Sequence, residues 1–172
     1  MSQDSRLTGV PANPVPSARM RELDFFLGRW QAVGIVHPMT PDAPRKSIEM
    51  RIEGSIEASG FWITRRAREL PTAQNPVPLT GFAVWGYDAG TDEFVGYWYD
   101  SAGCRAEQRS QGWDGDRFEL AGSVVNVLGD AYHLTDTFTR RGPDAYHHIS
   151  VVLVGGESFA ADEEECVRVA EL

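Results

Sequence analysis

The sequence predicts an all-β fold: an antiparallel up-and-down barrel of about ten strands with a short N-terminal helix. After Gly28, short runs of alternating apolar and polar residues follow one another, which is the pattern of half-buried strands. Turn sequences such as Asp88-Ala89-Gly90 and Asp114-Gly115-Asp116 separate these runs, as tight hairpins require. Closing so many consecutive strands into a barrel removes the long exposed edges that a flat sheet would leave.

The composition is that of an ordinary globular protein. In 172 residues, 42% are apolar and 24% are charged, which is enough for one sizeable core. The 16 basic and 25 acidic side chains give a net charge of −9, which argues against a nucleic-acid or anionic-membrane partner. The sequence shows neither a secretory signal nor the ~20 apolar residues of a membrane helix, so we expect a cytoplasmic protein. Cys104 and Cys166 are expected to be structural thiols.

The elements follow in order along the chain. Residues 1–16 are rich in proline and lack apolar periodicity, so we expect a flexible tail, and residues 17–172 are expected to form a single barrel domain. Ser17 is expected to cap a short helix, and Gly28 to end it in the left-handed conformation. The apolar residues of this helix recur at helical spacing: Met20, Leu23 and Leu27.

Ten strands are predicted after this helix. Neighbours in sequence are expected to pair, because short turns join most of them. The proline-rich segment Pro71 to Pro78 and the acidic segment Gly155 to Glu165 are expected to be loops near an open rim. The predicted strands are Arg29 to His37, Ser47 to Glu57, Phe61 to Leu70, Leu79 to Tyr87, Glu93 to Tyr99, Cys104 to Trp113, Arg117 to Ala121, Ala131 to Arg140, Ala145 to Val154 and Cys166 to Glu171.

Several short motifs resemble an uncharacterised bacterial family of lipocalin-like barrels. They are Leu27-Gly28-Arg29-Trp30, Gly86-Tyr87-Asp88, the run from Tyr97 to Gly103, Gly112-Trp113-Asp114-Gly115 and the run from Asp136 to Arg140. The resemblance covers roughly residues 20 to 172. It implies a calycin-type barrel with a lumen, distantly similar to fatty-acid-binding proteins and nitrobindins, and it implies no particular reaction.

Strand alternation places Arg65 on the inner face of the barrel, together with Phe61, Ile63 and Ala67. A guanidinium in a cavity of low dielectric must meet a carboxylate, lumen water or an anionic ligand. An internal ion pair, or a solvated position beyond the end of the strand, is the alternative.

Asp136 is also expected to face inward, with Tyr132, Leu134 and Phe138. Pairing with Arg65 would lower the pKa of Asp136, whereas apolar surroundings would raise that pKa toward a useful acid or base.

The late strand places His147 on the face of Ile149, Val151 and Leu153, so His147 is expected inside and His148 outside. Adjacent histidines on opposite faces cannot chelate one metal ion. Because no His-Glu-x-x-His pattern or carboxylate cluster is present, we expect no metal site and no other cofactor.

The remaining wall is expected to combine small polar groups with aromatic rings. Gln108 is expected inward with Cys104, Ala106 and Ser110. Trp85, Tyr97 and Tyr99 are expected to supply aromatic surfaces for a ligand.

These residues lead to three functional hypotheses. The first is binding of a small, largely apolar molecule in the lumen, with Arg65 as anchor for an anionic group and Trp85, Tyr97, Tyr99 and Gln108 as wall. The second is a cofactor-free cyclase or isomerase for a polyene or polyketide-like substrate of specialised metabolism, with Asp136 or His147 as acid or base. The third is haem binding, because the Gly28-Arg29-Trp30 start resembles the nitrobindin opening and those proteins use a late histidine. An edge or rim contact would give a homodimer.

Overall fold

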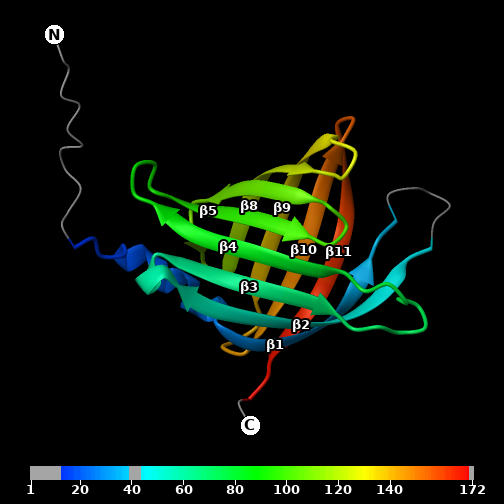
Figure 1. Cartoon of the computed structure of the whole chain (residues 1–172), viewed down its shortest axis with the longest axis horizontal. Helices are drawn as coiled ribbons and strands as arrows, with labels where there is room; N and C mark the ends of the chain where they lie inside the picture. The colour runs from blue at the N-terminus through cyan, green and yellow to red at the C-terminus, as the bar shows by residue number, and fades with distance from the viewer. Residues whose placement is uncertain (1–12, 39–43, 171–172) are drawn as a thin grey trace.

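The computed structural model describes residues 13–38 and 44–170. It confirms the predicted all-β fold, because ten antiparallel strands of this part of the chain close a barrel with a short 3₁₀ helix at one end (Figure 1). Neighbouring strands pair in chain order from β1 to β6, and the β6–β8 and β1–β11 pairings complete the circle. Of the predicted tail, residues 1–12 lie outside the described residues.

The strand bounds follow the turn residues of the sequence. They are β1 (Gly28–Val36), β2 (Lys46–Glu57), β3 (Trp62–Glu69), β4 (Thr80–Asp88), β5 (Glu93–Asp100), β6 (Arg105–Ser110), β7 (Trp113–Asp114), β8 (Arg117–Val125), β9 (Ala131–Arg140), β10 (Ala145–Val154) and β11 (Glu157–Arg168). The two-residue β7 pairs with the start of β8 and is not part of the closed ring. A single turn of 3₁₀ helix, η2 (Ala58–Gly60), joins β2 to β3.

The last strand differs from its prediction. The strand predicted to start at Cys166 begins at Glu157, so the predicted acidic loop Gly155 to Glu165 is wrong. Only the turn Gly155-Gly156 separates β10 from β11, and β11 pairs with β10 on one side and β1 on the other. Two paired neighbours satisfy the backbone of this acidic segment and hold it extended despite its low strand propensity.

One end of the barrel is closed by the helix η1 (Ala18–Phe26), which fills the interior with aromatic rings. The predicted cap is present, since the Ser17 hydroxyl accepts a hydrogen bond from the Arg19 backbone N–H, and Gly28 has a φ of +86°. Arg168 of β11 donates hydrogen bonds to the carbonyl oxygens of Phe25 and Leu27. The rings packed in this half belong to Phe25, Phe26, Trp30, Trp85, Phe94, Trp113, Phe118, Phe138 and Tyr146.

At the other end the predicted proline-rich loop joins β3 to β4. The buried carboxylate of Glu69 holds this loop: it accepts hydrogen bonds from Asn75 Nδ2 at 2.7 Å and from the Leu79 backbone N–H at 2.7 Å. Lys46 Nζ adds an ion pair at 3.0 Å. Within the described residues, no helix has the length and apolarity needed to cross a membrane.

Candidate functional site

Arg65 lies inside the barrel, as strand alternation predicts. Its side chain on β3 is surrounded by four rings, whose centres lie 4.8 Å (Trp85), 5.2 Å (Phe26 and Phe138) and 5.8 Å (Tyr146) from the guanidinium carbon. Only 7% of the residue is exposed, and Nη2 donates a hydrogen bond of 2.6 Å to the Tyr146 hydroxyl. Cation–π attraction to these rings stabilises the charge in place of a carboxylate.

The Arg65 charge has no acidic partner among the described residues, and its Nε has no hydrogen-bond partner there. The ion pair with Asp136, one of the two expectations for that carboxylate, is therefore absent. Trp85 lies beside Arg65 in the aromatic layer, which we call the aromatic floor and define as Phe26, Trp85, Phe138 and Tyr146. This floor separates the packed end of the barrel from a polar half.

Asp136 on β9 faces inward as expected and is held by three polar groups of the polar half. Gln108 on β6, also inward as expected, donates from Nε2 to Oδ2 at 2.6 Å. The Ser150 hydroxyl donates to Oδ1, and His148 Nε2 lies 3.2 Å from the same oxygen. Burial alone would raise the pKa of Asp136, but His148, Ser150 and Gln108 together leave that pKa below its ordinary value.

His148, rather than His147, is the histidine that faces the interior. His147 lies on the outer face, where Nε2 is 2.9 Å from Glu163 Oε1, so its expected position in the lumen is wrong. The inward face of β10 comprises Tyr146, His148, Ser150 and Val152, and the apolar Ile149 and Leu153 lie on the other face. The interior accepts the more polar face of β10 because β9 and β11 bring acidic partners to it.

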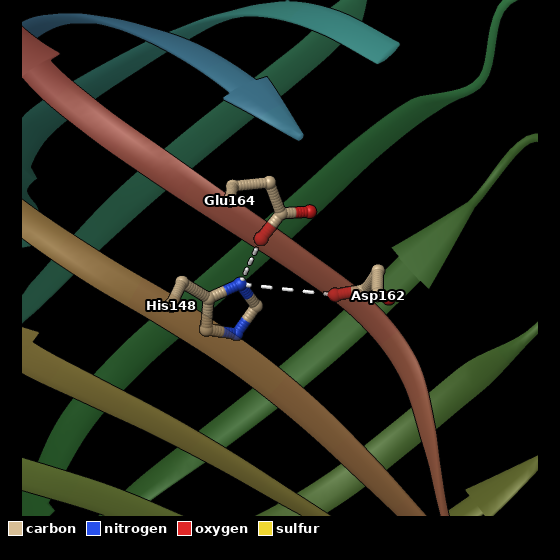
Figure 2. Close-up of side chains that lie close together, drawn as sticks. All are labelled: His148, Asp162 and Glu164. Atoms are coloured by element: carbon tan, nitrogen blue, oxygen red, sulfur yellow. Dashed lines mark hydrogen bonds and ion pairs between the residues drawn. The ribbon is translucent and has the colours of Figure 1, made fainter. Parts of the chain in front are cut away.

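Two of these partners come from β11. His148 Nδ1 is 2.5 Å from Glu164 Oε2 and 3.8 Å from Asp162 Oδ1 (Figure 2). Burial lowers the pKa of His148, but the charge of Glu164 and the contact with Asp136 outweigh burial and raise it to about 10. Burial and the charge of Glu164 raise the pKa of Asp162 to about 7. We call His148, Asp136, Asp162 and Glu164 the acid–histidine cluster.

Three side chains of this cluster are partly exposed to solvent. The side chains of Asp136 and His148 are 15% and 17% exposed, and that of Asp162 is 29% exposed, although all three face inward. Inward-facing side chains of a filled barrel would be out of reach of solvent, as the rings of Trp30, Phe94 and Phe118 in the packed half are. Met50, Trp98 and Leu134 are further inward-facing residues that remain partly exposed. The polar half is therefore packed less completely than the aromatic half.

Tyr97 and Tyr99 lie on the outer face of β5, so their expected position in the lumen is wrong. Phe94, Gly96 and Trp98 face inward instead. A Cβ on Gly96 would lie 3.2 Å from the Trp85 and Leu120 side chains, so close packing selects this face. Tyr97 and Tyr99 help to line a surface groove of about 360 Å³ outside the barrel, with Glu57, Trp62, Thr64 and Val84.

The sequence reasoning missed His148, Asp162 and Glu164. One signal was available for β11, because continuing the alternation of Cys166 backwards places Glu164 and Asp162 on the inner face. For His148 no local signal existed, because the apolar residues of its strand lie on the opposite face.

Comparison with solved structures shows the same fold in two proteins. The crystal structure of Rv2717c from M. tuberculosis has a TM-score of 0.68 at 12% identity, and the alignment covers 90% of this chain and 99% of that one. The S-type phycobiliprotein lyase CPES from Guillardia theta has a TM-score of 0.62 at 14% identity, with 91% and 100% of the two chains covered. At these identities the similarity concerns the fold.

A comparison with curated proteins finds no match. A family model described as "Protein of unknown function (DUF1579)" matches residues 15–138, which include the helix η1 and the residues Arg65, Gln108 and Asp136. The match extends over more than half of the sequence, and the chain therefore belongs to the DUF1579 family.

Proposed function

We propose that this protein binds a small, largely apolar molecule in the polar half of the barrel. The observation that carries the proposal is the solvent exposure of inward-facing side chains, 15% at Asp136 and 17% at His148, above a closed aromatic floor. Ligand sites of this kind are concave and mostly apolar, with a few convergent polar groups that fix orientation. Trp98 supplies an aromatic wall, and Gln108 and the acid–histidine cluster supply the polar groups.

The unpaired charge of Arg65 favours a ligand that carries an anionic group. Its guanidinium is buried without a countercharge among the described residues, and a buried charge is costly unless it is paired. A ligand carboxylate that reaches the floor would complete the hydrogen bonding of the guanidinium. Tyr146 already holds one end of this group.

Tryptophan fluorescence tests this proposal, because Trp85 and Trp98 both face the interior. The probes are fatty and aromatic carboxylic acids and, as neutral controls, their methyl esters. We expect saturable binding of an acid, about tenfold weaker in Trp98→Ala. Arg65→Met is expected to weaken binding of the acid and to leave binding of its ester unchanged.

Tyr97→Ala is the matched control, since Tyr97 is adjacent to Trp98 and lies on the outer face. Its affinity is expected to equal that of the unmodified chain. Loss of binding in Tyr97→Ala with full affinity in Trp98→Ala would place the ligand in the outer groove and contradict the proposal. Absence of binding across the panel, together with no small molecule in native mass spectra of the purified protein, would also contradict it.

A second candidate function is a cofactor-free isomerase or cyclase that uses the same space. The observation that favours it is the position of the His148 imidazole, which is held between Asp136 and Glu164 and is 17% exposed. Two fixed partners orient the imidazole as a proton-transferring group. The fold similarity to a lyase agrees with a catalytic use of such a barrel. Turnover of a polyene or polyketide-like substrate is expected to fall at least 100-fold in His148→Gln. Turnover unaffected in His148→Gln, with His147→Gln as control, would exclude this role.

A further inference from the structure

We propose that His148, Asp162 and Glu164 form a binding site for a divalent transition-metal ion, with zinc as the first candidate. One ligand atom from each residue lies within 4.8 Å of the others, on the paired strands β10 and β11 (Figure 2). Imidazole nitrogen and carboxylate oxygen are ligands that Zn²⁺ takes, and three protein ligands leave one position open for water or a substrate.

The charge around the imidazole favours a cation. Three carboxylates, Asp136, Asp162 and Glu164, surround one histidine, and the described Lys and Arg residues make no hydrogen bond or ion pair to them. The Glu164 side chain is only 6% exposed. Carboxylates gathered this closely repel one another and require pairing or metal coordination, and one imidazole cannot neutralise all three.

A carboxylate oxygen without a partner marks the position for the ion. Asp162 Oδ1 is buried and accepts no hydrogen bond within the described residues, while it lies 3.8 Å from His148 Nδ1. A buried acceptor that lacks a partner is unfavourable, because it has lost its hydrogen bonds to water without replacement. A metal ion between Nδ1 and the two carboxylates would bind this oxygen directly.

The second ring nitrogen of His148 has the partner that metal-binding histidines usually have. Nε2 lies 3.2 Å from Asp136 Oδ1, and Gln108 and Ser150 hold that carboxylate in place. When Nε2 donates its proton to Asp136, Nδ1 presents a lone pair toward Asp162 and Glu164. On metal binding the imidazolium releases one proton to solvent, and the 2.5 Å gap between Nδ1 and Glu164 widens to about 3 Å.

The experiment uses the full chain, stripped with EDTA and free of organic ligands, so failure of metal binding and failure of small-molecule binding are distinguishable. Zn²⁺ is titrated by calorimetry, and Co²⁺ by its visible absorption. We expect one ion per chain and a rise in melting temperature with Zn²⁺. Asp162→Asn and Glu164→Gln are expected to weaken binding at least tenfold, and Asp136→Asn by about 10–100-fold through the imidazole.

His147→Ala and Glu163→Gln are the matched controls, because this pair has the same chemistry one residue away on the outer face. Both are expected to bind Zn²⁺ as the unmodified chain does. Circular dichroism verifies the fold of each variant, and the nearly isosteric Asp162→Asn decides the matter if another variant fails to fold. No heat and no cobalt absorption would overturn the site, as would unchanged affinity in Asp162→Asn or loss of binding confined to the outer-face variants.

Discussion

The Tyr146 hydroxyl on β10 accepts a hydrogen bond of 2.6 Å from Nη2 of Arg65 on β3, across the interior of the barrel. These strands are not neighbours in the sheet, so the contact joins opposite walls. Among the described residues, Tyr146 is the hydrogen-bond partner of the buried Arg65 guanidinium. The aromatic rings around the guanidinium stabilise it further.

Removing the hydroxyl should therefore be costly. Tyr146→Phe is expected to lower the free energy of unfolding by about 2 kcal/mol, because a charged donor loses its acceptor while staying buried. Urea denaturation followed by fluorescence measures this. The double variant with Arg65→Met is expected to lose at least about 1 kcal/mol less than the sum of the single losses. Strict additivity would show that the two side chains are not coupled.

Glu69→Gln should loosen the loop between β3 and β4. Asn75, the Leu79 N–H and Lys46 all bind the same oxygen of Glu69, Oε2. A neutral amide oxygen in that place accepts more weakly from these donors than a carboxylate does, and it loses the charge that attracts Lys46. We expect a loss of about 1–3 kcal/mol and faster hydrogen exchange confined to residues 70–79. Glu53→Gln, on the exposed face of β2, serves as control. Unchanged exchange in the loop would contradict this role of Glu69.

Gly34→Ala tests the close contact between β1 and β11. A Cβ at Gly34 would lie 2.2 Å from the Glu163 carbonyl oxygen and 2.7 Å from Glu164 Cγ. Because backbone cannot move away without separating the strands, we expect a destabilisation of about 1–3 kcal/mol and a displaced Glu164. Thermal unfolding measures the first effect, and weaker zinc binding measures the second. Ala substitution at Gly129 affects only the backbone conformation and provides a comparison, because no described residue beyond its chain neighbours lies within 4 Å of the added Cβ.

The free energy of unfolding, measured in EDTA as a function of pH, is expected to reflect the protonation of His148. Its pKa of about 10 in the folded chain lies above the ordinary 6.5, so its contribution is complete below pH 6.5 and is lost as the pH rises toward 10. Denaturant titrations between pH 6 and 10 are expected to show a decline that is flatter in His148→Gln. His147→Gln should retain the decline, and an equal slope in all three proteins would contradict the assignment.

Alternation along the strands predicted most of the barrel, together with the inward positions of Arg65, Gln108 and Asp136. It failed where both faces of a strand carry residues suited to an interior. On β5, packing of Gly96 against Trp85 and Leu120 selects the face of Trp98, and only the assembled neighbours supply that information.

The acid–histidine cluster escaped prediction for a related reason. His148 faces inward because acidic residues from β9 and β11 meet it there, and this pairing depends on register between strands. In the sequence, His148 stands beside apolar residues, and Asp162 and Glu164 stand in an acidic segment that is typical of a loop. Neither segment indicates that it will contact the other. Their proximity is a property of the closed sheet.

Closure through β1 and β11 also constrains how the molecule forms. The first strand finds its second partner only in residues 157–168, so the ring cannot close during synthesis before that segment has left the ribosome. Pairings between segments this far apart in sequence favour slow folding, and an unpaired edge of β1 is a site where chains can aggregate.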